Sequence, residues 1–263
     1  MTTILNAEFY KLKSNIGFKL LPAAAALMTL VTIGFMLFVS GGATVEGESF
    51  TVTDVFGFEP EGRLGAGALT TLSNLYGFIA AVFAGLFIST EFNQGTIRNA
   101  LSVGVSRTKV YLSKLAVSAA LLALCMLLSC ITFIVGFTLT YGFGVTGIEG
   151  FLRDALTVFF LQFLYHFTYS GIGYLLAFLI PNIVITVAIG IIIVVASGVV
   201  VEICTAFDAL NGIAPFIPQY YVTRLNGALH NPLFLVTGAA VSVVFVAATA
   251  VMGCLLFKRQ DIK

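Results

Sequence analysis

Six long apolar stretches, separated by short polar segments, constrain this chain more than any other feature. Each has about 20 residues or more with almost no formal charge, so as an α-helix it can cross a hydrocarbon core of about 30 Å. Inside lipid the backbone must satisfy its own hydrogen bonds, which an α-helix does. The sequence therefore predicts an all-α integral membrane protein with spans at residues 20–39, 68–90, 115–140, 155–180, 183–204 and 235–257.

The composition agrees with a protein whose main solvent is lipid. Hydrophobic residues make up 59% of the 263 residues, charged residues make up only 10%, and the mean hydropathy is +1.05. We expect a single transmembrane domain over residues 1–263. No cleavable signal peptide is expected, because the first apolar stretch is too long and follows about 20 amphipathic residues. Four cysteines lie in or beside the spans without metal-ligand spacing, and we interpret them as small core residues: Cys125, Cys130, Cys204 and Cys254.

Lysine and arginine are distributed unequally between the two sides that six spans create. Ten of the 13 fall on one side, and the other side receives three of them with most of the acidic residues. Positively charged loops stay in the cytoplasm, so both termini are expected there. The free cysteines and the overall plan suit a multi-pass protein of a bacterial plasma membrane. The ten are Lys11, Lys13, Lys19, Arg98, Arg107, Lys109, Lys114, Lys258, Arg259 and Lys263.

The segment 91–114 is the only sizeable loop on the predicted cytoplasmic side. Gly95 is expected to stop the helix that leaves the membrane, and the hydroxyl of Thr96 to cap a short helix over residues 97–103. Gly104 ends that short helix, and Ser106 can cap the helix that leads into the third span. The pattern predicts a helix, a short lateral helix and another helix.

The short helix has one apolar side, formed by Ile97, Ala100 and Leu101 at three- and four-residue spacing. That side could lie on the membrane or in a protein groove. Glu91 precedes Arg98 by about two turns, and we expect the two to form an ion pair that stiffens the bend. An ordinary solvated loop, whose charge only orients the protein, is the alternative.

The N-terminal segment 1–19 has its own amphipathic pattern. Apolar residues recur at three- or four-residue steps, with lysines beside them, which indicates a helix lying in the cytoplasmic interface of the membrane. A positively charged lead-in without a fixed helix is the alternative. The apolar residues are Leu5, Phe9, Leu12, Ile16 and Leu20.

These features together resemble the permeases of type-2 ABC exporters. The resemblance rests on Glu91, Gly95-Thr96, Ser106-Arg107 and Lys114, and on the six spans and the topology. It implies that 1–19 is a connecting helix and that 91–114 holds a coupling helix contacting a separate cytoplasmic ATPase. It also implies dimerisation with a second permease copy or a paralogue. The residues expected to couple to the ATPase are Glu91, Gly95, Thr96, Ile97, Arg98, Leu101, Ser106, Arg107 and Lys114.

The segment 205–234, between the last two spans, contains three prolines that prevent one long helix: Pro215, Pro218 and Pro232. The resemblance implies short re-entrant helices on the outer side here. A plain interfacial loop is the alternative.

Motifs for nucleotide or bond hydrolysis are missing. The chain has no GxxxxGK[ST], HExxH or GxSxG pattern, so we expect no ATPase or common hydrolase activity of its own. ATP and magnesium are expected on the partner ATPase, with no cofactor on this chain and no nucleic-acid partner. Membrane lipids are the remaining expected partner. The spans also lack the buried charges of ion-driven carriers, and His166 is interpreted as a hydrogen-bonded packing residue.

A stripe of small residues follows the second span at four-residue intervals. Such a stripe lets another helix approach closely, either in fixed packing or as a sliding contact. Its members are Gly77, Ala81, Gly85 and Ser89.

The function expected from the resemblance is ATP-driven export of an amphipathic or lipophilic cargo. The family exports drugs, antimicrobial peptides, lipids or polysaccharides, or confers resistance to such peptides. The short loops and Phe-rich spans favour a peptide or drug. A non-transport signalling or scaffold subunit driven by an ATPase partner is the alternative, and an intramembrane enzyme is the more remote one.

Overall fold

The computed structural model describes residues 2–14, 16–40, 44–45, 48–49, 66–142 and 148–260, and within them the fold is a bundle of long helices. The N-terminal half contains α1 (Thr2–Ser14), α2 (Ile16–Ser40), η1 (Ala66–Leu72), α4 (Ser73–Ala84), the π-helical η2 (Gly85–Ser89), α5 (Thr90–Asn93), α6 (Thr96–Ser102) and α7 (Arg107–Tyr141). The C-terminal half contains α8 (Ile148–Leu179), α9 (Ile183–Ala206), η3 (Ala214–Phe216), α10 (Pro218–Ala228) and α11 (Pro232–Arg259). One antiparallel pair of two-residue strands, β1 (Thr44–Val45) and β2 (Glu48–Ser49), lies outside the bundle.

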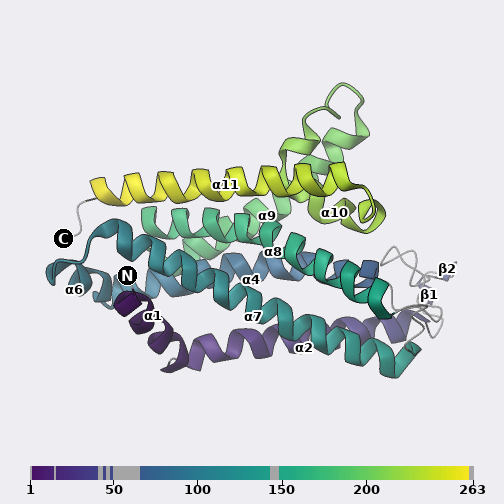
Figure 1. Cartoon of the computed structure of the whole chain (residues 1–263), viewed down its shortest axis with the longest axis horizontal. Coiled ribbons are helices and arrows are strands. Elements are labelled where there is room, and N and C mark those ends of the chain that lie inside the picture. The colour runs from purple at the N-terminus through teal and green to yellow at the C-terminus, as the bar shows by residue number, and fades with distance from the viewer. Residues whose placement is uncertain are drawn as a thin grey trace.

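The long helices run side by side, and the two ends of the bundle differ (Figure 1). The helices α1 and α6 and the last turn of α11 lie at one end, whereas β1 and β2 lie at the other. We call the first of these the α6 end. The α7 helix has 35 residues, or about 50 Å, and is therefore longer than a hydrocarbon core. Its first turns extend past the apolar layer toward α6.

Local sequence explains several helix boundaries. Asn182 and Asn231 precede α9 and α11, and each side chain accepts a hydrogen bond from a backbone N–H in the first turn. Pro218 and Pro232 occupy the first turns of α10 and α11, where a missing N–H costs nothing. The segment 205–234 thus contains two short helices, with α10 packed against η1, α8, α9 and α11.

Five helices among the described residues are long and apolar enough to cross a membrane. They cover Lys19–Ser40, Ala68–Asn93, Arg107–Tyr141, Ile183–Ala206 and Pro232–Arg259. The remaining predicted span, 155–180, is the fourth along the chain and corresponds to α8 as far as Leu179; this helix is long enough but less apolar. The reason is that α8 packs against four other long helices and turns polar side chains inward.

Two of these inward side chains on α8 are Gln162 and His166, each 1% exposed. The Gln162 Nε2 atom donates to Ser73 Oγ at 2.6 Å, and His166 Nδ1 donates to the Gln162 carbonyl oxygen at 2.7 Å. His166 also meets the Tyr76 ring edge-on, at 5.5 Å between ring centroids. His166 is therefore a hydrogen-bonded packing residue, as the sequence predicted.

The apolar core has two main clusters, one toward each end of the bundle. The cluster toward the strand end includes Met36, Tyr76, Phe133 and Tyr165. The cluster toward the α6 end is formed by α4, η2, α6, α7, α8 and α11, and includes Phe87, Ile97, Tyr111, Tyr174 and Phe257. The short helix α6 thus belongs to the packed core of the bundle.

Candidate functional site

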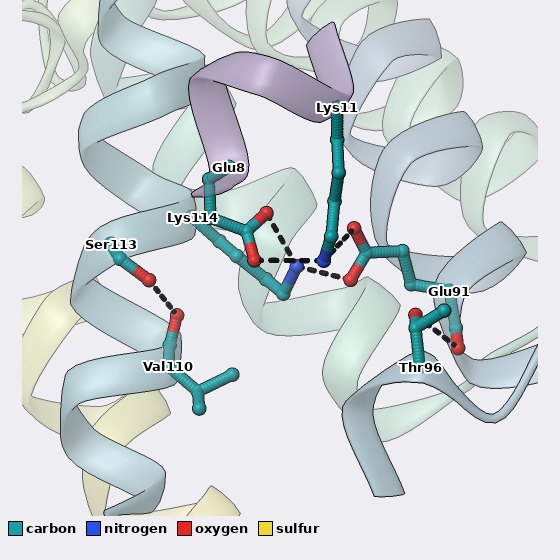
Figure 2. A network of polar contacts seen from close by, with 7 residues as sticks. All are labelled: Glu8, Lys11, Glu91, Thr96, Val110, Ser113 and Lys114. Carbon is teal, nitrogen blue, oxygen red and sulfur yellow. Dashed lines mark hydrogen bonds and ion pairs between the residues drawn. The ribbon is translucent and has the colours of Figure 1, made fainter. Parts of the chain in front are cut away.

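Four charged side chains meet at the α6 end of the bundle, and we call them the ion cluster: Glu8, Lys11, Glu91 and Lys114. Figure 2 shows that they converge from α1, α5 and α7. The Lys114 Nζ atom lies 3.0 Å from Glu8 Oε2 and also contacts Glu91 Oε2. The Lys11 Nζ atom lies 3.1 Å from Glu8 Oε1 and 3.3 Å from Glu91 Oε1. Each ammonium group therefore bridges both carboxylates.

Burial makes the ion cluster energetically important. The Lys114 side chain is 1% exposed, and those of Glu8 and Glu91 are 8% and 9% exposed. A charge taken out of water at this depth must be paired, because its desolvation costs several kcal/mol. Two carboxylates and two ammonium groups cancel, and the Phe87 ring adds a cation–π contact 4.7 Å from Lys114 Nζ.

Lys11 is the member of the ion cluster that water reaches, with a side chain 40% exposed. Burial lowers the pKa of Lys11, but the carboxylates of Glu91 and Glu8 outweigh this effect and raise the pKa above its ordinary value of 10.5. Folding therefore favours the ammonium form. This contribution to stability is complete below the unfolded pKa and is lost only as the pH rises through the folded pKa.

The expected ion pair between Glu91 and Arg98 is wrong. Glu91 faces the interior, where Lys11 and Lys114 hold it, whereas Arg98 is exposed and takes part in none of the ion pairs among the described residues. The physical reason is the turn at Gly95, whose φ of +69° redirects the chain between the two residues. The side chain of Glu91 thus fixes the bend to α1 and α7, and not to Arg98 of α6.

The short helix α6 runs from Thr96 to Ser102, one residue earlier than the predicted 97–103. Its boundaries follow from Gly95 and from Gly104, which has a φ of +88°. The expected cap by Thr96 is wrong, since this residue already lies in the helix. Its Oγ1 atom donates to the Glu91 carbonyl oxygen at 3.1 Å and so ties α6 back to the ion cluster.

The apolar side of α6 packs against its own bundle. Ile97 is 1% exposed and lies in the core cluster at the α6 end, with Ala100 and Leu101 packed against that cluster. The opposite side exposes Arg98 and Asn99 to the surroundings. A partner that approaches the α6 end therefore meets the polar side of α6.

The start of α7 is joined to the end of α11. Ser106 occupies the position before α7 with extended backbone, but its side chain forms no capping hydrogen bond. The Arg107 Nη1 atom donates to the carbonyl oxygens of Phe257 and Lys258, each at 3.0 Å, and to that of Gln260. These are the carbonyls that a helix end leaves without partners, so Arg107 caps α11 from outside.

The small-residue stripe of the second span faces α9. A Cβ atom on Gly77 would lie 3.0 Å from Val194, and one on Gly85 would lie 2.5 Å from Val187. Between them, Ala81 meets Gly190, where an added Cβ would come within 2.9 Å. Ser89 is buried at the end of this stripe. In this structure the stripe makes a close contact within the chain.

Sequence reasoning missed the part played by Glu8 and Lys11. A signal was available, because Glu8, Glu91 and Asp261 are the only acidic residues on the predicted cytoplasmic side. A lysine at position 114, beside a long apolar stretch, needs a nearby carboxylate. Local spacing could not identify which of these acids it was.

Comparison with known proteins assigns the chain to a family. A family model described as "ABC-2 family transporter protein" matches residues 4–197, which include α1, the ion cluster, α6 and most of α9. A search of curated proteins finds no match. The matched region is more than half of the 263 residues, and the described residues contain five helices apolar enough to span a membrane. The chain therefore belongs to the ABC-2 transporter family, as the membrane permease of an ABC transporter.

Proposed function

We propose that this permease is the export subunit of an ATP-driven transporter, coupled through α6 to a separate cytoplasmic ATPase and paired with a second permease copy or a paralogue. The observation that carries the proposal is the two-sided environment of α6. Its Ile97 side is anchored in the core, and its Arg98 side is exposed. A short helix held in this way can transmit a push from a partner into the bundle.

The contacts behind α6 support a mechanical role. Thr96 bonds to the backbone of Glu91, and the ion cluster links Glu91 to α1 and α7. Arg107 links the start of α7 to the end of α11. A displacement of α6 would therefore be shared by α1, α7 and α11. Closure of an ATPase pair around ATP and magnesium would supply that displacement, and the spans would tilt to open the dimer outward.

The proposed cargo is an amphipathic or lipophilic molecule, with an antimicrobial peptide or a drug as the first choice. The chain has 25 phenylalanines and short loops between its helices, which suits an apolar cargo better than a sugar. We place the protein in a bacterial plasma membrane with both termini in the cytoplasm, six spans including α8, and outer re-entrant helices at η3 and α10.

The test is the variant Arg98→Glu in the full chain, purified in mild detergent from its native membrane with whatever ATPase accompanies it. Because Arg98 is exposed, we expect the variant permease to fold normally. Its affinity for the ATPase, or its stimulation of ATP hydrolysis, should fall about tenfold, which corresponds to about 1.4 kcal/mol of binding free energy. The matched control is Arg153→Glu, the same charge reversal at an exposed arginine in the second turn of α8, a helix that begins toward the strand end. Its surface pair with Asp154 contributes little to stability.

Association with the ATPase and cargo flux are measured separately. Loss of ATPase stimulation in Arg98→Glu, with Arg153→Glu unchanged, supports coupling through α6. Unchanged ATPase association and turnover in both variants would overturn it. Nucleotide turnover without flux of any cargo from inside to outside would favour a signalling subunit instead of an exporter.

A further inference from the structure

An apolar groove of about 550 Å³ lies between α1, α2 and α7. Its walls are Phe9 and Leu12 of α1, Pro22 of α2, and Leu121 and Leu124 of α7. The volume is in the range of about 300–1,000 Å³ that is typical of small-molecule sites. Lys13 and Lys19 are the charged residues that line it.

These two lysines differ from those of the ion cluster in having no carboxylate partner in the part of the chain that the structure describes. Among the residues that the structure describes, neither Lys13 nor Lys19 takes part in an ion pair, and both are exposed. The two nearby carboxylates, Glu8 and Glu91, are already shared by Lys11 and Lys114. The groove therefore combines an apolar wall with two lysines that form no ion pair with any described carboxylate.

The position of the groove relative to the apolar layer identifies its occupant. The apolar stretch of α2 begins at Lys19, so the groove straddles the boundary between hydrocarbon and headgroups. Beyond it, Leu20 and Leu27 of α2 are about 60% exposed and continue the apolar surface into the membrane. A molecule that fills the groove needs an apolar chain on the membrane side and a negative charge at the level of the lysines.

We propose that this groove binds an anionic phospholipid of the leaflet that contacts α1. An acyl chain lies along Leu12, Leu121 and Leu124, and the headgroup phosphate lies between Lys13 and Lys19. Basic pockets between helices at the cytoplasmic surface have this chemistry for anionic headgroups. The lipid fills the space between α1, α2 and α7, and its negative charge complements Lys13 and Lys19.

The experiment measures lipid binding to the purified full chain by native mass spectrometry. The probes are dioleoyl phosphatidylglycerol and dioleoyl phosphatidylcholine, which share their acyl chains and differ in net charge. We expect the anionic lipid to bind at least tenfold more tightly. Lys13→Gln and Lys19→Gln should each weaken its binding about fivefold, and about 25-fold together, without affecting the zwitterionic lipid. Lys109→Gln, at an exposed lysine outside the groove, is the control.

A second pair of variants tests the apolar part of the groove. Ala120→Trp places a large ring in the groove and should weaken both lipids, whereas Ala196→Trp, on the exposed side of α9, should weaken neither. Both positions are exposed, so the variants are expected to fold, and gel filtration verifies this. Glycerol 3-phosphate, which has the headgroup charge but no acyl chain, should not compete.

Three results would overturn the proposal. Equal binding of the two lipids, or binding that survives loss of both lysines, removes the charge recognition. Full binding in Ala120→Trp means that the lysines act from the surface and the groove is not used. Competition by glycerol 3-phosphate identifies a free-anion site or a partner's acidic segment in place of a lipid. The lipid-binding experiment contains neither nucleotide nor ATPase, so its outcome does not depend on the test of Arg98.

Discussion

The two lysines of the ion cluster contact the same two carboxylates but differ in how much water reaches them. Lys114 is 1% exposed at its side chain and Lys11 is 40% exposed. Removal of either lysine leaves the same two carboxylates with one ammonium group. The space left at position 11 is open to water, which can screen the excess charge, whereas the space left at position 114 is closed to water. The energetic role of a charge at this site is thus set by its depth more than by its distance from a partner.

We predict that Lys114→Met lowers the free energy of unfolding by about 3–5 kcal/mol, because Glu8 and Glu91 remain buried with only Lys11 between them. Lys11→Met should cost about 1 kcal/mol or less, since Lys114 still bridges both carboxylates. Titration with a denaturing detergent in mixed micelles gives both values. The combination Lys114→Met with Glu91→Gln restores neutrality and should recover part of the loss. Equal, small losses for the two lysines would contradict the argument.

At the level of secondary structure, the close contact between the second span and α9 depends on two small residues, Ala81 and Gly190. A Cβ atom added to Gly190 would lie 2.9 Å from the Cβ atom of Ala81 and 3.5 Å from its Cα atom. Backbone cannot yield as a flexible side chain can, so any added atom must push the two helices apart. Gly198, two turns further along α9, has nothing within 4 Å of an added Cβ.

These two glycines form a matched pair for a packing experiment. Gly190→Ala should lower the free energy of unfolding by about 1–3 kcal/mol, whereas Gly198→Ala should leave it unchanged or raise it slightly through helix propensity. Adding Ala81→Gly to Gly190→Ala removes the opposing methyl group and should restore most of the loss. The same detergent titration reports all three variants. A similar loss in Gly198→Ala would mean that the effect is not one of close packing.

Features encoded within a few residues could be predicted from the sequence. Gly95 and Gly104 bound α6 to within one residue of expectation, because a left-handed backbone is a local property of glycine. The partner of Glu91 could not be found in this way. Lys11 lies 80 residues away in the chain, and only the packing of α1 on α7 brings the two together. The π-helical turn at Gly85–Ser89 also had no sequence signal, and it shifts the residues that follow relative to a regular helix.

For the whole molecule, the open question of topology concentrates on α8. Its polar side chains, such as Gln162 and His166, lower the mean hydropathy of α8, and they face other helices and not lipid. The beginning of α8 lies toward the strand end and its last turn toward the α6 end. If α8 crosses the membrane, residues at its two ends must be accessible from opposite sides of the membrane.

We predict that Gly150→Cys is labelled by a membrane-impermeant maleimide in intact cells, and that Asn182→Cys is labelled only after the membrane is opened. Both positions are exposed; Gly150 lies in the first turn of α8, and Asn182 lies just beyond its last turn. Ser102→Cys on α6 should behave like Asn182→Cys, and Gly212→Cys, in the turn before α10, like Gly150→Cys. The four native cysteines are first replaced with alanine, and the cysteine-free variant is used only if it retains activity. Labelling of Gly150 and Asn182 from the same side would exclude a sixth span.

The wide separation of the ion cluster along the chain has a consequence for biogenesis. Glu8 leaves the ribosome 106 residues before Lys114, and Glu91 precedes Lys114 by 23. Until Lys114 has been synthesised, Lys11 is the only lysine of the ion cluster that can pair with the carboxylates of Glu8 and Glu91. The helix α1 can therefore dock in its final position only after the third span has been synthesised. Docking of α1 thus requires that the first three spans are correctly inserted.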